Sequence, residues 1–568
     1  MQHVITDRNP PAAVRAAGGV AVADVNGDGW PDFYALTGQE GAGTLMLNQG
    51  DGSFRDATPG SGLDVLTHHA SGPLFFYFDA DALPDFVVGS ADYSPPRLFR
   101  NLGDGKFTEV FIWLFAGMEG INTTSITAAD IDLDGDSDLF LTHWQEPFLP
   151  DHFFLNDGGR DFLLGDKLLG FGGSCGPTDH SFTANFRDLN GDDYPDLLLT
   201  GDFGCTQLWM NERGQRFVQR DPQAFTDQNG MGAAIGDFDN DGDEDWFVSA
   251  IYDDDGILEG NWSGAGNRLY ENIGQGTLRV LPGHRTPLDA GWGWGSTLAD
   301  LDLDGWLDLA VVNGWPKGSK QFYRDATKIF MGDAYYPFRE QLYLGDSLQG
   351  RGVSAFDYDL DGDLDLLIAN YDGPLRLFRN EHPNPEDHLV VQPLSDGRPD
   401  VGARVVLHSS QGLQQHTIST GSNYCSQNMP LAHFGIGPNV KIDSVVVYFT
   451  TGATYTLLDP VKGTTYRPSA DAISVVTGRA LTVRPNPVRV DSRIEVQRPS
   501  RGQGRVTVYD LFGRERAKLK LTERTAEIDT FTFSTGDELV AGQYVVVYTA
   551  PGSRFRIVTQ LIQVFQFD

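Results

Sequence analysis

One acidic motif recurs seven times in the first two-thirds of the chain, with Asp or Asn at positions 1, 3, 5 and 9 of almost every copy. Alternate side chains on a tight loop direct their oxygens at one centre, and the carbonyl at position 7 adds another. About six or seven oxygens suit Ca²⁺, whereas Mg²⁺ demands stricter octahedral geometry. The candidate ligands are, copy by copy, Asp24, Asn26, Asp28 and Asp32; Asp79, Asp81 and Asp85; Asp130, Asp132, Asp134 and Asp138; Asp188, Asn190, Asp192 and Asp196; Asp237, Asp239, Asp241 and Asp245; Asp300, Asp302, Asp304 and Asp308; and Asp357, Asp359, Asp361 and Asp365.

Two copies depart from this pattern. The second has Tyr77 in place of the first ligand and Ala82 at position 6, so it is either a weaker site or an empty one. The fourth has Asp193 at position 6, where a positive φ favours Gly, but keeps every ligand. Asp and Gly clusters also form plain solvated turns, but seven copies in one register favour bound ions.

We therefore expect six or seven structural Ca²⁺ ions. An ion at about a hundred times its dissociation constant stabilises the fold by roughly 2.7 kcal/mol. No His joins the ligand sets, and nothing in the motif indicates catalysis by the metal.

The segments around each motif indicate strands. A run of small and apolar residues precedes it, as in 19–23, and an apolar run follows, as in 197–200. Third and fourth strand signals come next, and copies begin roughly 50 to 60 residues apart, near the period of propeller blades. We predict an all-β chain in which residues 1–383 form a seven-bladed β-propeller. Blade seven lacks a fourth strand of its own, and residues 3–7 are expected to supply it.

These Asp-rich blades resemble FG-GAP/VCBS repeats, which also build integrin-type propellers. The resemblance covers residues 1–383 and implies calcium loops on one face, with the loops between second and third strands on the other.

Composition changes after residue 383. Residues 384–470 contain 401–405, 421–427, 433–437 and 443–449, which together resemble the ASPIC/UnbV module that follows such propellers in proteins similar to cartilage acidic protein. The resemblance implies an architecture more than a chemistry. From the residues alone we expect a small β-sandwich docked on the propeller. His433 is interpreted as a structural histidine in a turn, because no nucleophile or acid partner is visible beside it.

Residues 475–568 form a third unit. The segments 481–488, 506–514 and 539–547 resemble landmarks of the C-terminal sorting domain read by the type IX secretion system of Bacteroidota. An ordinary Ig-like β-sandwich is the alternative. The resemblance implies the type IX machinery as a partner and an extracellular or outer-surface location. It also implies a signal peptide, which this sequence does not show, so we expect a leader to be missing.

Net charge, apolar runs and cysteine content exclude several classes of function. A net charge of −36 without a basic stripe argues against nucleic acid and anionic membranes. No apolar run is long enough to span a bilayer. Of the three cysteines, Cys175 and Cys205 either pair outside the cell or remain free thiols, and Cys425 is left over.

The face opposite the calcium loops is the expected ligand face. Aromatic and polar residues in its connections suit sugar stacking or peptide capture, unless they pack between blades as Trp292 and Trp294 can. We predict a protein that binds glycans or extracellular proteins. The alternatives are a polysaccharide-active enzyme such as a lyase, for which no catalytic cluster is visible, and a structural subunit of an extracellular assembly. The candidate ligand-face residues are His69, Trp144, Trp262 and Trp315.

Overall fold

The computed structural model describes residues 16–36, 43–66, 69–145, 150–172, 179–253, 264–315, most of 322–371, 373–421 and 423–470. Beyond residue 470 it describes the backbone of seven strands between residues 481 and 564. Strands dominate the described chain, so the predicted all-β class is confirmed. No described helix has the length and hydropathy that crossing a bilayer requires.

Seven antiparallel sheets follow one another along described residues 19–378. Each sheet runs in chain order, and each candidate metal loop joins its first strand to its second. The strands of the first four sheets are β1 (Gly19–Ala23), β2 (Asp32–Leu36), β3 (Thr44–Asn48) and β4 (Phe54–Asp56); β5 (Ala70–Phe76), β6 (Asp85–Ser90), β7 (Arg97–Gly103) and β8 (Lys106–Val110); β9 (Ser125–Ala129), β10 (Asp138–Thr142), β12 (His152–Asn156) and β13 (Phe162–Leu164); and β14 (Asp179–Arg187), β15 (Asp196–Gly201), β16 (Gln207–Asn211) and β17 (Phe217–Gln219), with β11 (Trp144–Gln145) beside β14.

The last three sheets repeat the arrangement. The seventh has three strands among the described residues, in agreement with the missing fourth-strand signal; residues 3–7, expected to complete it, lie outside the described part. One short helix, α2 (Trp113–Ala116), follows β8. The strands are β18 (Gly230–Gly236), β19 (Asp245–Ala250), β20 (Arg268–Asn272) and β21 (Leu278–Val280); β22 (Gly293–Ala299), β23 (Asp308–Asn313), β24 (Lys328–Met331) and β25 (Glu340–Tyr343); and β26 (Gly350–Phe356), β27 (Asp365–Asn370) and β28 (Arg376–Phe378).

The first strands of the sheets form a closed cycle. Each of β1, β5, β9, β14, β18, β22 and β26 contacts the next, and β26 contacts β1. This order is that of a β-propeller with the first strands innermost. Apolar side chains fill the spaces between neighbouring sheets, as in the cluster that holds Tyr34, Phe75, Phe86 and Phe99.

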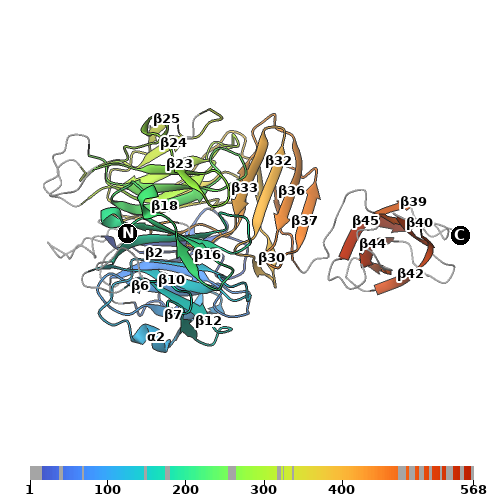
Figure 1. Cartoon of the computed structure of the whole chain (residues 1–568), viewed down its shortest axis with the longest axis horizontal. Coiled ribbons are helices and arrows are strands. Elements are labelled where there is room, and N and C mark those ends of the chain that lie inside the picture. Colours follow the sequence, from blue (N-terminus) through green and yellow to red (C-terminus); the bar gives the residue numbers. More distant parts are fainter. Residues whose placement is uncertain are drawn as a thin grey trace.

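A second unit follows the ring and forms its own core. Its apolar core includes Leu389, Val405, Phe434 and Val445. We call residues 384–470 the module. Its strands are β29 (His388–Val391), β30 (Leu394–Ser395), β31 (Arg398–Pro399), β32 (Arg404–Ser409), β33 (Gly412–Thr417), β34 (Ser426–Gln427), β35 (Ala432–Gly435), β36 (Ile442–Tyr448), β37 (Thr454–Leu458) and β38 (Thr464–Tyr466). Figure 1 shows β32, β33, β36 and β37 standing beside the ring of sheets.

One segment of the module enters the ring. The described residues 419–421 and 423–428, called the plug, include β34, which pairs in parallel with β1 through Val20↔Ser426 and Ala21↔Gln427. Tyr424 and Cys425 are almost fully buried. The small residues of the first strands make room for the plug, because a Cβ on Gly19 would lie 1.9 Å from the Cys425 carbonyl oxygen.

Beyond residue 470 the described backbone forms one seven-stranded sheet, whose strands are ordered β39-β40-β43-β42-β41-β44-β45. An all-β C-terminal unit agrees with the sequence analysis, and its identity as a sorting domain stays a prediction. The strands are β39 (Leu481–Arg484), β40 (Arg493–Gln497), β41 (Arg505–Asp510), β42 (Glu515–Arg524), β43 (Ile528–Thr532), β44 (Gly542–Thr549) and β45 (Arg556–Val564).

The two alternatives predicted for Cys175 and Cys205 were a disulfide and two free thiols. Cys205 is disulfide-bonded, while Cys175, its expected partner, lies outside the described residues. Cys425 is free and buried in the plug.

Candidate metal centres

We number the seven loops between first and second strands as loops 1 to 7. In every loop the Asp at position 9 opens the second strand and is almost fully buried. In loop 5, one oxygen of Asp245 accepts the Phe238 N–H at 3.3 Å and the other accepts the Asn272 N–H at 2.8 Å. The same two bonds recur in all seven loops. Position 9 therefore ties the loop to the third strand, whatever it also gives to an ion.

Positions 1 and 5 shape the turn. In loop 3, the Asp130 carboxylate accepts the backbone N–H groups of Asp134 and Gly135, and Asp134 accepts that of Asp136. Such side-chain-to-backbone bonds are the Asx turns for which Asp is favoured. They point the carboxylates into the loop.

The backbone of six loops is tightly wound. Position 6 has positive φ in all six, including Asp193 at 74°, as predicted. Position 4 is also left-handed, and in loop 3 it is Leu133 at 61°. A bulky side chain rarely adopts that conformation without compensation. Loop 2 differs, because none of residues 77–85 has positive φ.

Four loops gather three carboxylates each, with one oxygen from every carboxylate within 4.8 Å of the others. In loops 3, 5 and 7, a buried oxygen of the position-3 carboxylate has no hydrogen-bond partner: Asp132 Oδ1, Asp239 Oδ1 and Asp359 Oδ1. Buried carboxylate oxygens normally have partners, so this donor set fits a hard cation such as Ca²⁺. The clusters are Asp130, Asp132 and Asp138; Asp237, Asp239 and Asp241; Asp300, Asp302 and Asp304; and Asp357, Asp359 and Asp361.

Loops 1 and 4 carry Asn at position 3. The Asn26 amide donates to the position-5 carboxylate of Asp28 at 2.9 Å, and Asn190 does the same to Asp192 at 3.3 Å. One carboxylate fewer leaves less negative charge for an ion to neutralise. These loops keep the ligand positions with a weaker demand for a cation.

Loop 2 is compensated by arginine instead. Tyr77 occupies position 1, and Arg100 Nε lies 2.7 Å from Asp79 Oδ2. Arg398 of the module donates to the Asp79 carbonyl at 3.0 Å. One guanidinium group therefore pairs with a carboxylate of this loop, and a second binds its backbone.

Loop 7 has both a cluster of three carboxylates and a paired arginine. Arg379, which directly follows β28, has the place that Arg100 has on β7, and it pairs with Asp359 at 3.0 Å and Asp361 at 3.1 Å. The corresponding residue of sheet 5 is Glu271, whose charge helps to raise the pKa of Asp239. The third strands thus supply opposite charges to otherwise similar loops.

The pKa values of the position-9 carboxyls are raised mainly by burial and further by the neighbouring carboxylates. Burial, with repulsion from Asp239 behind it, raises the pKa of Asp245 to about 10. Burial likewise raises the pKa of Asp138 to about 8 and that of Asp85 in loop 2 to about 7. A bound cation would remove the cost of keeping these groups ionised.

The module docks on the loops themselves. Arg398 Nη2 donates to the Gly135 carbonyl of loop 3 at 3.0 Å, and Gln411 Nε2 donates to the Asp304 carbonyl of loop 6 at 2.9 Å. The Gln415 N–H donates to Asp237 Oδ2 of loop 5 at 3.2 Å. His433 lies in β35 rather than in a turn, and its Nε2 lies 2.9 Å from the Gly362 carbonyl of loop 7. Its predicted structural role agrees with this contact.

A cavity of about 620 Å³ remains between loops 1 and 7 and the module. Asp24 and Asp357 line one side, and His388 and His433 line the other. Burial lowers the pKa of His433 to about 3, so the ring is neutral, and its Nδ1 has no partner. The cavity therefore offers acceptors and carboxylates, but no catalytic pair among its described lining residues is within hydrogen-bond distance.

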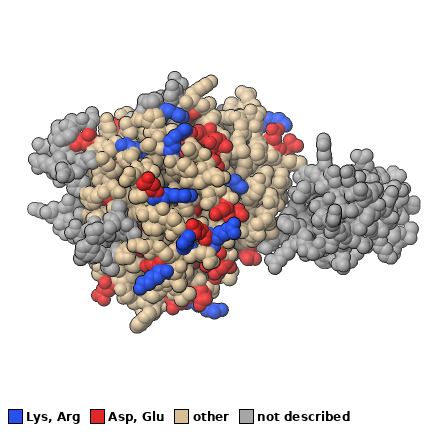
Figure 2. Space-filling model, in the orientation of Figure 1, with Lys and Arg blue, Asp and Glu red and all other residues tan. Residues whose placement is uncertain are grey.

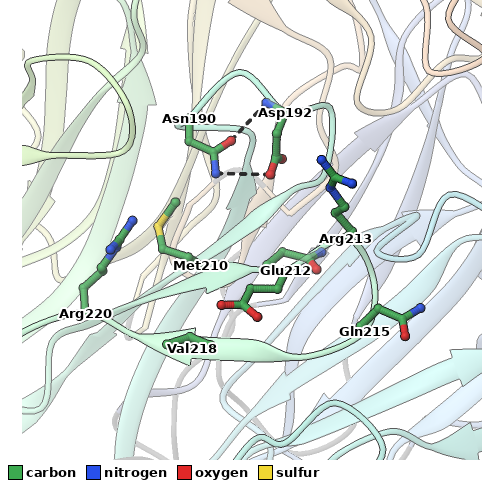
Figure 3. Close-up of a pocket in the computed structure, with 9 residues that line it drawn as sticks. Asn190, Asp192, Met210, Glu212, Arg213, Gln215, Val218 and Arg220 are labelled. Carbon is green, nitrogen blue, oxygen red and sulfur yellow. Dashed lines mark hydrogen bonds between the residues drawn. The ribbon is translucent and has the colours of Figure 1, made fainter.

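A second hollow of about 510 Å³ lies beside loop 4. Figure 3 shows Asn190 and Asp192 of the loop at one end of this hollow and Glu212, Arg213 and Arg220 around it. On this side the fourth loop is open to solvent.

The predicted ligand-face residues are only partly accessible. Trp315 is half-buried and stacks on Trp292 with ring centroids 4.5 Å apart. Trp144 stacks on Phe182 at 5.8 Å, and its Nε1 donates to Asp202 at 3.3 Å. His69 is half-buried, and Trp262 lies outside the described residues. His69, Trp144 and Trp315 line none of the described pockets.

Charges are mixed on the visible surface. Figure 2 shows acidic and basic residues interspersed over the described face, without a continuous basic area.

Sequence reasoning missed the plug and the docking of the module on the metal loops. The plug is a polar, glycine-containing run that is typical of a surface loop, and its buried pairing with β1 leaves no periodic signal. The small residues of the first strands were the one sequence signal that could have indicated the plug, since they leave space for another segment near the axis of the ring.

Comparison with known proteins identifies repeats in the ring of sheets and a known domain in the module. The FG-GAP-like repeat profile matches residues 24–88, 77–141 and 188–248, and the ASPIC and UnbV profile matches residues 394–470. Cartilage acidic protein 1 from Mus musculus is 30% identical over 280 residues, covering 45% of this chain and 40% of that protein. The Homo sapiens protein is 30% identical over 278 residues, covering 45% and 39%. The chain therefore spans about 40% of the length of these relatives.

Solved structures with a similar chain path include the Dos1 propeller, with a TM-score of 0.37 and 7% identity, covering 62% of this chain and 75% of that chain. A puromycin hydrolase mutant complexed with PGG has a TM-score of 0.33 and 12% identity, covering 87% and 62%.

Proposed function

We propose that this protein is an extracellular, calcium-loaded seven-bladed propeller that recognises glycans or extracellular proteins. The observation that carries the calcium assignment is the buried, unpartnered oxygen at position 3 of loops 3, 5 and 7. Each such oxygen stands in a cluster of carboxylates, and a hard divalent ion satisfies all of them at once.

The loops are proposed to differ in occupancy. Loops 3, 5 and 6 hold Ca²⁺ most tightly, since each combines three close carboxylates without a paired arginine among its described contacts. Loops 1 and 4 follow, with Asn at position 3. Loop 7 is weakened by Arg379, and loop 2 holds no ion, because Arg100 takes its place.

The extracellular setting rests on three supports. Cys205 is disulfide-bonded, and disulfides persist mainly in oxidising compartments. Extracellular calcium modules bind with dissociation constants of about 10⁻⁴ to 10⁻³ M, so partly neutralised loops such as 1 and 4 suit that environment. The similar curated proteins are named as cartilage acidic proteins.

Recognition is favoured over catalysis by the described side chains. Carboxylates outside the loops include Glu109, paired with Arg97, and Asp400, which accepts from Thr450. The His152–Asp166 pair, with Nδ1 and Oδ2 2.8 Å apart, lines none of the described pockets. Because the module covers the loop face, ligand recognition falls to the opposite face, where Trp144 and Trp315 are half-buried.

Glycan-array and matrix-protein binding by the calcium-loaded chain tests this function. Binding that falls at least about tenfold on Trp315→Ala, a loss of about 1.4 kcal/mol, supports it. A control variant on the module, Lys441→Gln, should bind normally. Release of unsaturated uronate from polysaccharides, with no stable complex between the chain and the glycan, would instead favour the enzyme alternative.

Residues 475–568 are proposed to direct type IX secretion. Deleting them in a host that has this system should leave the chain inside the cell. Unchanged export of the truncated chain would refute this part and leave the recognition proposal intact.

A further inference from the structure

We propose that metal loading of the loops controls the seating of the plug, so that the module is a calcium-dependent stopper of the propeller's centre. This inference rests on the calcium occupancy proposed above and adds a conformational consequence to it. The observations that carry it are the contacts of the plug inside the ring and those of the module on the loops.

The plug is bound by the innermost strands of most sheets. Gln427 exchanges two hydrogen bonds with the Phe75 backbone, at 2.8 and 2.7 Å, and accepts one at its carbonyl from Ser354 at 3.1 Å. The Cys425 thiol donates to the Thr124 carbonyl at 2.9 Å.

Further bonds join the plug to other sheets. Asn423 donates to the Val353 carbonyl at 2.9 Å, and the Asn428 amide donates to Thr297 at 2.9 Å. Gly421 accepts from Asn185 at 3.1 Å. Hydrogen bonds thus connect the plug to six of the seven sheets.

Most plug contacts are neutral hydrogen bonds, and each contributes only about 0.5–1.5 kcal/mol net. The exception is at one end of the plug, where the Arg187 guanidinium donates to Ser419 at 3.1 Å. The plug is attached at both ends to the module. Its seating therefore depends on whether the module stays docked above it.

Several docking contacts are made to backbone carbonyls of the loops. Four loops offer carbonyls to the module: Asp79 and Gly135 to Arg398, Asp304 to Gln411, and Gly362 to His433. In loops 3 and 7 the accepting carbonyl belongs to the left-handed Gly at position 6. Those carbonyls point at the module only while the loop keeps its tight turn.

Close carboxylates oppose that turn unless a cation lies between them. The three oxygens of a cluster stand within 4.8 Å, where like charges repel by about 1 kcal/mol per pair even in bulk water and by more when buried. Loss of calcium therefore loosens the loops, withdraws the docking carbonyls and releases the plug. Loop 2, with its own arginine, stays folded and acts as the hinge side of the contact.

Cys425 reports the position of the plug. It is the only free thiol among the described residues and is 1% exposed. Its reaction with a maleimide therefore requires the plug to leave the ring. We would measure the labelling rate of Cys425 by peptide mass spectrometry across a calcium titration, and count bound calcium in the same samples.

If unseating requires loss of one ion, calcium at about a hundred times its dissociation constant should slow labelling about 100-fold relative to EGTA. Amide hydrogen exchange of β19, a fully buried strand of sheet 5, is the check against global unfolding, and its protection should be retained in EGTA.

Arg398→Gln removes the contacts to loops 2 and 3 from the module side. It should raise the labelling rate in calcium at least about tenfold without changing the calcium count, because hydrogen bonds from a charged group are the stronger ones. Lys441→Gln, a matched loss of one positive charge on a side chain that pairs with Asp443 within the module, should label as the wild type does.

The outcomes separate the two proposals. Calcium binding with an unchanged Cys425 rate would overturn the stopper and leave the proposed calcium function standing. No bound calcium would overturn both. Labelling that rises only together with loss of amide protection in β19 would mean unfolding of the ring, which also contradicts a released plug.

Discussion

Loops 2 and 5 share one frame and differ in how their charge is compensated. Asp85 and Asp245 each accept two backbone N–H groups at the same places, and each opens a buried second strand. Loop 5 then gathers three carboxylates around an unpartnered oxygen, whereas loop 2 pairs Asp79 with Arg100. The repeat therefore determines how the first strand connects to the second in every loop. The positive charge that compensates the carboxylates differs from loop to loop.

The comparison also separates two roles of aspartate. Position 9 builds the fold, since its oxygens satisfy backbone donors that would otherwise be buried without partners. Positions 1 and 5 also shape the turn, and with position 3 they face the proposed ion. Variants at position 9 should therefore lower stability alike in loops 2 and 5, whereas variants at positions 3 and 5 should change calcium binding only in loop 5.

The largest effect is expected at position 9, and it should be equal in both loops. Asp245→Ala and Asp85→Ala each leave two buried N–H groups unpaired, which costs about 1–3 kcal/mol apiece. Chemical denaturation in calcium and in EGTA should show a loss of about 3 kcal/mol or more for each variant. A loss confined to loop 5 would mean that position 9 acts only through the metal.

Next in size is the loss of one ion. Asp239→Asn with Asp241→Asn should lower the calcium count by one and remove about 2.7 kcal/mol of calcium-dependent stability. The matched pair Asp79→Asn with Asp81→Asn in loop 2 should change neither quantity. Isothermal titration calorimetry and thermal melts with and without calcium give both numbers, and an equal loss of calcium in the two variants would erase the distinction.

The prediction of the fold from sequence succeeded where the signal is local. Asp at position 9 and the apolar runs beside it mark the strand boundaries, so the sheets could be placed from residues such as Asp32 and Asp308. The compensation of loop 2 could be only half predicted: Tyr77 announced a missing ligand, but Arg100 lies on another strand and meets Asp79 only through the register of β6 and β7. The plug could not be predicted, because Gln427 and Phe75 are 352 residues apart.

A smaller effect is expected from pH in the metal-free protein. The pKa of Asp245 is raised to about 10 and that of Asp85 to about 7, so both favour the folded state while protonated, and this stability is lost as pH rises through those values. The melting temperature of calcium-free protein should fall between about pH 5 and 9 and change less with calcium bound. Asp245→Asn should flatten the alkaline half of that fall more than Asp85→Asn; equal flattening would contradict the difference in charge between the loops.

The smallest effect belongs to the arginine of loop 2. Arg100 is 40% exposed on its side chain, and such pairs contribute about 0–1 kcal/mol. Arg100→Gln should lower stability by no more than about 1 kcal/mol in a denaturation experiment. Arg379→Gln, its counterpart in loop 7, should tighten calcium binding there, and weaker binding would show that Arg379 helps to hold the loop instead.

Anomalous scattering from a crystal grown with calcium tests the central claim most directly, because it locates each ion without reference to stability. We predict peaks between the carboxylates of loops 3, 5 and 6 and none in loop 2, where Arg100 stays on Asp79. Empty loops 3, 5 and 6, or an ion in loop 2 with Arg100 turned away, would contradict the account.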